Sequence, residues 1–84
     1  MNPDELKAIL RRQPFIPFRL HVSDGASYDI RHPEMVLLTR RAAYIGVPAE
    51  DLIPEKAVIV SLIHVSRLEE LPAGSKSTGN GQTG

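Results

Sequence analysis

The residues of this chain best suited to binding chemistry are arginines, a histidine and a tyrosine near the ends of predicted strands. Arg31 and His32 follow one alternating segment, and Arg40 and Arg41 stand between two others. Guanidinium groups suit phosphates and carboxylates, and loops at the end of a sheet commonly bind ligands. We therefore take these four residues, with Tyr44 as an exposed aromatic side chain, as candidate ligand-binding residues. The alternative is that they only keep the turns soluble.

The chain carries no motif for catalysis or metal binding. Cysteine is absent, and no short ligand spacing joins the three histidines, which are His21, His32 and His64. No nucleophile motif or phosphate-binding loop is present, and the paired carboxylates are sequence neighbours rather than groups that converge on a cleft. We therefore expect a protein that is not an enzyme and has no metal site and no cofactor.

Charge and hydropathy exclude further classes. Ten basic and ten acidic residues give a net charge of zero, which argues against a strongly basic nucleic-acid binder. The charge is uneven, because residues 11–47 hold six arginines against three acids, whereas residues 48–71 hold two bases against five acids. No apolar run reaches the ~18 residues of a membrane span. The N-terminal residues lack a secretory signal, so we expect no membrane association and a cytoplasmic location.

The elements that position the candidate residues begin with two alternating segments joined by Asp24 and Gly25, which is typical of half-buried strands. A two-residue turn would set apolar Leu20 opposite Asp29. A three-residue loop that ends at Gly25 sets Leu20 opposite Tyr28 and keeps one face apolar. We therefore predict the three-residue loop, with Asp24 and Gly25 as structural turn residues and Gly25 in the left-handed conformation.

This register also predicts the solvent side of the hairpin. Arg19 stands opposite Asp29 there, and a cross-strand ion pair between them is expected. His21 lies on the same polar side.

Helix and strand signals account for the rest of residues 1–71. Asn2 and Pro3 have the chemistry of a helix start, and Pro14 ends that helix. Alternation predicts further strands, and pairing Leu38 with Ala43 keeps one apolar face between the first two of them. The predicted strands cover residues 35–39, 42–47, 57–61 and 65–69, the last two being either separate or one long bent strand.

These elements predict a mainly β (α+β) fold. An N-terminal helix precedes five or six short antiparallel strands that form a small SH3/Sm-like barrel, and one domain covers residues 1–71. Leu52 and Ile53 are expected to tuck against that barrel from the polar loop over residues 48–56, where a short helical turn could form. Residues 72–84 hold no large apolar side chain, so we expect a disordered tail.

The pattern of residues 13–25, 28–34 and 60–69 resembles a group of short uncharacterised bacterial proteins, frequent in planctomycetes. The likeness covers residues 6–71, and it implies no catalytic residues. A second likeness is to bacterial Sm-like RNA chaperones, which also run helix, strand, turn, strand and end in a histidine-containing corner. That resemblance implies RNA binding, although this chain differs by an additional hairpin and loop at residues 40–56.

We therefore expect a non-enzymatic binding or assembly module. Its partner would be a second copy or another protein, held through a free strand edge on the fourth or the last strand. The alternative is a nucleic-acid-binding, Sm-like domain that uses Arg31, Arg40 and Arg41 as an arginine-rich rim.

Overall fold

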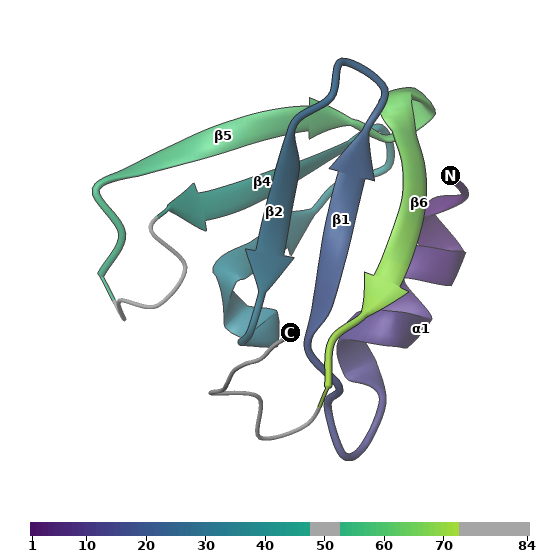
Figure 1. Cartoon of the computed structure of the whole chain (residues 1–84), viewed down its shortest axis with the longest axis vertical. Coiled ribbons are helices and arrows are strands. Elements are labelled where there is room, and N and C mark those ends of the chain that lie inside the picture. Colours follow the sequence, from purple (N-terminus) through teal and green to yellow (C-terminus); the bar gives the residue numbers. More distant parts are fainter. Residues whose placement is uncertain (48–52, 73–84) are drawn as a thin grey trace.

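The N-terminal helix α1 (Pro3–Arg11) begins with the predicted capping chemistry. The Asn2 side chain accepts a 2.8 Å hydrogen bond from the Asp4 backbone, and the Glu5 side chain accepts a 3.2 Å bond from the Asn2 backbone. This capping box satisfies amide groups that the first helical turn leaves without partners. At the other end, a 3.3 Å ion pair joins Arg12 to Glu70, and Figure 1 shows α1 beside β6, the strand that ends at Glu70.

The computed structural model describes residues 1–47 and 53–72, and these form α1 and six antiparallel strands in two sheets (Figure 1). One sheet has the order β2-β1-β6 and the other β3-β4-β5, with three strands in each. Two 3₁₀ turns, η1 (Pro33–Met35) and η2 (Leu62–His64), connect the sheets. The strands are β1 (Phe18–Val22), β2 (Ser27–Ile30), β3 (Val36–Leu38), β4 (Ala42–Val47), β5 (Lys56–Ser61) and β6 (Val65–Glu70).

The predicted register of the first hairpin is confirmed. Leu20 pairs with Tyr28, and the Val22 backbone donates a 2.9 Å hydrogen bond to Ala26, which leaves a three-residue loop. Gly25 ends that loop with φ of 96°, a conformation that side chains with a Cβ rarely adopt. Pairing of Leu38 with Ala43 in the β3–β4 hairpin is confirmed as well. Residues 57–69 are two strands separated by η2 rather than one bent strand.

The core lies between the inward sides of the two sheets. Its buried members come from α1, from both sheets and from η2, and they are Leu6, Phe18, Leu20, Ile30, Ala43, Ile45, Val60 and Leu62. Alternation along each strand places the intervening residues on the outward sides. Each sheet therefore has one buried and one outward face, and the outward faces are where the sheets differ.

The structure differs from the sequence predictions in the closure of the barrel, in the edge of the fourth strand and in the position of Ile53. The hydrogen bonding of the described residues forms two separate sheets and no closed barrel. The fourth strand offers no edge, because β4 is paired on both sides, whereas β6 pairs only with β1 among the described strands and has α1 beside it (Figure 1). Ile53 does not tuck in and is 86% exposed, since Pro54 rather than Ile53 packs over the sheet. The expected helical turn and Leu52 lie outside the described residues, as does the expected disordered tail apart from Pro72.

No helix among residues 1–47 and 53–72 has the length and apolar character that crossing a bilayer requires.

Candidate interaction face

Among the described residues, no outward position of strands β3, β4 and β5 holds Asp, Glu, Lys, Arg or His. We call the outward side of this sheet the uncharged face, and define it by the outward residues of the three strands, which are Leu37, Ala42, Tyr44, Gly46, Ala57, Ile59 and Ser61. A sheet face turned to water normally bears polar and charged side chains. An outward face without any charge is therefore a candidate for contact with another molecule.

A row of three large side chains crosses the middle of this face. Leu37 pairs with Tyr44, and Tyr44 pairs with Ile59 on the other side. Directly opposed side chains on neighbouring strands lie ~5 Å apart, so the three form one continuous apolar strip. Leu37 is 67% exposed, Tyr44 37% and Ile59 62%.

The two ends of the uncharged face differ in height. At one end, the paired outward strand residues are the small Ala42 and Ser61, and the turn with Arg40 and Arg41 lies beyond them. At the other end, Pro54 lies directly over Gly46. A Cβ built on Gly46 would approach Pro54 Cγ to 2.8 Å. Glycine is therefore needed at residue 46 to admit the proline ring.

A hollow of about 450 Å³ adjoins the uncharged face along the outer edge of β5. Ile59 belongs to both the hollow and the central row. The opposite wall comes from the first hairpin and η2, through Val22, Tyr28 and His64. Ile59 therefore links the apolar strip to a concave region, whose lining also includes the polar residues Ser23 and Asp24.

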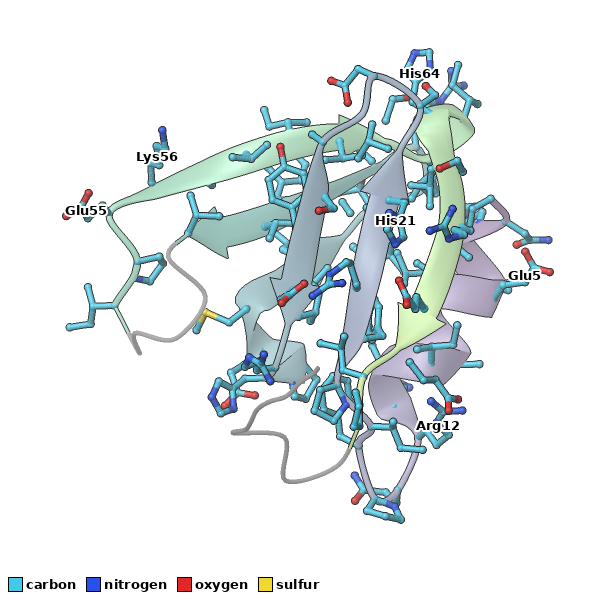
Figure 2. All side chains as sticks on the ribbon, in the orientation of Figure 1. Glu5, Arg12, His21, Glu55, Lys56 and His64 are labelled. Carbon is cyan, nitrogen blue, oxygen red and sulfur yellow. The ribbon has the colours of Figure 1, made fainter. Side chains whose placement is uncertain are left out.

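The outward side of the β2-β1-β6 sheet is the opposite in character, and we call it the charged face. Two cross-strand rows make it up: Asp29–Arg19–Glu69 and Ser27–His21–Arg67. Arg19 donates two hydrogen bonds to Asp29, at 2.7 and 3.2 Å, so the predicted cross-strand pair is confirmed. His21 Nε2 lies 2.9 Å from Glu69 Oε1. Figure 2 shows His21 near the middle of β1 on this side.

These contacts shift the ionisation of the groups involved. The hydrogen bond from Arg19, with its positive charge, lowers the pKa of Asp29 against the opposing effect of burial. The same bond raises the pKa of Arg19. The pKa of Glu69 is lowered mainly by its hydrogen bond with His21. Each shift favours the charged form, so the charged face is stabilised by its own ion pairs.

The structure separates the candidate residues that the sequence singled out. Arg40 and Arg41 are exposed in the β3–β4 turn, whereas Arg31 and His32 are exposed after β2. No hydrogen bond or ion pair among the described residues joins the two pairs, and Arg31 instead lies 3.7 Å from Asp29. Tyr44 is exposed as expected, and it stands in the middle of the uncharged face.

The histidines are also separate from one another. Figure 2 shows His64 at the η2 corner, away from His21 on β1. Within the described part of the chain, no group of three or more His, Asp or Glu side chains could hold a metal ion.

Sequence reasoning missed Leu37 and Ile59 as partners of Tyr44. The signal was present for Leu37, because the register that pairs Leu38 with Ala43 also sets Leu37 opposite Tyr44. Ile59 required the β4–β5 register, and the long connection between those strands does not determine it.

Comparison with known proteins found no matching family model, no matching curated protein and no matching solved structure. Function must therefore be inferred from the two outward faces and the residues on them.

Proposed function

We propose that this chain is a non-enzymatic binding or assembly module and that the uncharged face is its docking surface. The observation that carries the proposal is the central row, in which Leu37, Tyr44 and Ile59 stand exposed side by side. Contiguous exposed apolar side chains on a small protein commonly mark an interaction site.

The chemistry of the row suits the centre of an interface. Complete burial of an exposed Leu or Ile side chain contributes about 1.5–3 kcal/mol of binding free energy. Leu37 and Ile59 are more than half exposed, so a partner that covers them would gain most of that contribution. Tyrosine is enriched among the residues that dominate binding energy, because it combines a large apolar ring with a hydroxyl group. A partner that covers Tyr44 and its two neighbours would therefore gain several favourable contacts from three residues.

The finer fold and identity remain part of this proposal. We infer an SH3/Sm-like arrangement, supported by β1 pairing with both β2 and β6 and by the 3₁₀ turn η2 between β5 and β6. Membership of the planctomycete-type group and a cytoplasmic location remain predictions from the sequence.

A test of the docking role compares two lysine substitutions on opposite faces. Ile59→Lys places a charge on the uncharged face, whereas Ser27→Lys adds the same charge to the charged face. The immobilised chain is exposed to itself in solution and to a total protein extract, and the retained protein is measured. We expect the immobilised original chain and its Ser27→Lys variant to retain protein, and the Ile59→Lys variant to retain none. Equal retention by both variants, or none by the original chain, would refute the docking role.

A second candidate function is nucleic-acid binding through Arg31, Arg40 and Arg41. The supporting observation is that Arg40 and Arg41 are exposed and make no ion pair with the described residues. This function predicts salt-sensitive binding of a single-stranded oligonucleotide that weakens when Arg40 and Arg41 become alanine. Absence of binding at low salt would remove this candidate.

A further inference from the structure

We propose that the molecule that covers the uncharged face is a second copy of this chain. The two copies pack face to face about a twofold axis that runs along the central row, across the strands. Leu37, Tyr44 and Ile59 then each meet the same residue of the second copy. This inference rests on the proposed docking role of the uncharged face, and it adds the identity and orientation of the partner.

The absence of charge makes the face compatible with itself. Two copies of a charged surface oppose like charges in many orientations, which is costly when those charges lose water. The strand residues of the uncharged face have none to oppose. An interface of the same patch on both copies requires this self-complementarity.

Two simple orientations of the twofold axis can be compared. An axis along the strands keeps β4 of both copies parallel, so equal ends of the face meet. An axis across the strands reverses β4 of the second copy, so opposite ends meet. The charges and the shape at the two ends decide between these arrangements.

The charges favour the axis across the strands. Arg41 precedes β4, and its carbonyl accepts a 2.8 Å hydrogen bond from Leu62. Glu55 lies at the other end of β4, where its backbone donates a 3.0 Å bond to Val47. Figure 2 shows Glu55 at the end of β5 that is remote from η2. Arg41 pairs its backbone with Leu62, a core residue, so its side chain starts on the inward side of the sheet. What distinguishes the axes is the position of the turns: an axis across the strands places each Arg40–Arg41 turn at the Glu55 end of the other copy, whereas an axis along the strands gathers the four arginines of both turns at one end.

Lys56 does not cancel this complementarity. Residues alternate along β5, so Lys56 shares the side of Val60, which is buried in the core. Its side chain therefore lies on the inward side of the sheet and not on the uncharged face.

The shape of the face favours the same axis. Pro54 stands above the sheet over Gly46, whereas the outward strand positions at the opposite end hold only the small residues Ala42 and Ser61. With the axis across the strands, opposite ends of the face meet, so Pro54 of each copy lies over the small residues of the other copy. An axis along the strands would set the two prolines at the same end and hold the central rows apart.

The small area of the face argues for a weak association. Three strands span roughly 10 Å between the outer two, and strands of six residues are roughly 20 Å long, so the face is on the order of 200 Å². That is well below the ~800 Å² that each partner contributes to a standard interface. We therefore expect a dimer that forms at micromolar to high micromolar concentration.

Cysteine cross-linking of the full chain tests both the partner and the axis. The chain has no cysteine, so each introduced thiol is unique. Leu37→Cys and Ile59→Cys mark the two ends of the central row, and Ser27→Cys on the charged face is the control. The reagent is a bismaleimide that spans the ~10 Å between packed sheets. Thermal melting first checks that every variant is folded.

The axis across the strands predicts cross-linked dimers from Leu37→Cys alone and from Ile59→Cys alone, at least tenfold faster than from Ser27→Cys. An axis along the strands predicts rapid cross-linking only when the first two variants are mixed, and that result would overturn the proposed geometry. No excess over Ser27→Cys, together with a monomeric mass up to millimolar concentration, would overturn the second copy as partner. The docking role would survive that last result if Ile59→Lys still abolished retention of a protein from the extract.

Discussion

The two outward faces of this molecule belong to sheets of the same size, yet they meet water differently. On the charged face, five of the six outward strand residues are ionisable, and Arg19, Asp29, His21 and Glu69 are paired across strands. On the uncharged face, no outward residue of β3, β4 or β5 is Asp, Glu, Lys, Arg or His, and the largest side chains, Leu37, Tyr44 and Ile59, are exposed.

Because one short chain contains both faces, the contrast does not reflect its overall composition. Alternation places polar residues outward in β1 and β2, as water requires. The same alternation in β3, β4 and β5 places Leu37, Tyr44 and Ile59 outward. This difference is the reason we propose that the β3-β4-β5 sheet docks through its outward side.

The largest expected effect on stability comes from the raised end of the uncharged face. Gly46→Val places a side chain where a Cβ alone would approach Pro54 Cγ to 2.8 Å. The proline ring cannot rotate away as a flexible side chain can, so we expect the free energy of unfolding to fall by about 1–3 kcal/mol. Chemical denaturation measures this change.

The matched control is Ala57→Val, on the neighbouring strand and the same face. Ala57 is exposed, and valine suits a strand, so we expect no loss of stability. Equal losses from both substitutions would show that valine is tolerated poorly anywhere on this face and that Pro54 is not the cause.

A smaller effect is expected from the ion pair of the charged face. A double-mutant cycle with Arg19→Ala, Asp29→Ala and the double variant isolates their interaction. Both side chains are about one-third exposed. Solvent therefore weakens the pair, and we expect a coupling free energy of about 0.5–1 kcal/mol.

Salt sharpens the comparison between the faces. The Arg19–Asp29 coupling should shrink in 1 M NaCl, because salt screens partly exposed charges. The corresponding cycle with Leu37→Ala and Tyr44→Ala on the uncharged face should not shrink. Equal salt dependence of the two cycles would contradict the contrast between the charged and uncharged faces.

The smallest effect is a dependence on pH. The pKa values of Asp29 and Glu69 are lowered in the folded protein, so their contribution to stability is complete above the unfolded values near 4. As the pH falls through the lowered folded values, both carboxyls become protonated and that contribution disappears. The variant Asp29→Asn should therefore lose less stability between pH 5 and pH 2 than the original chain, measured by thermal melting. An identical loss would exclude Asp29 as a source of the acid sensitivity.

Local patterns in the sequence predicted much of the charged face. The alternation of apolar and polar residues, together with Gly25 in the turn, was sufficient to predict the β1–β2 register. That register placed Arg19 opposite Asp29. The pair of His21 with Glu69 was not predictable in the same way. These residues are 48 positions apart, and their contact depends on the pairing of β1 with β6.

The uncharged face shows the same limit. The exposure of Tyr44 followed from alternation within β4, but the row required the registers of two strand pairs. The position of Pro54 over Gly46 depends on how the β4–β5 connection folds back, and no local pattern encodes that contact. The predicted ligand-binding arginines lie in separate turns, Arg31 after β2 and Arg40 and Arg41 between β3 and β4. The sequence of a turn carries no information about which turns lie together in the fold.

Sedimentation equilibrium of the full chain, from low micromolar to millimolar concentration, tests most directly whether the uncharged face is covered by a second copy. The comparison includes Tyr44→Lys at the centre of that face and Ser27→Lys on the charged face. We expect a dimer for the original chain and for Ser27→Lys, with dimerisation weakened at least tenfold in a folded Tyr44→Lys. A monomer at every concentration, or dimers that form equally in all three proteins, would contradict it.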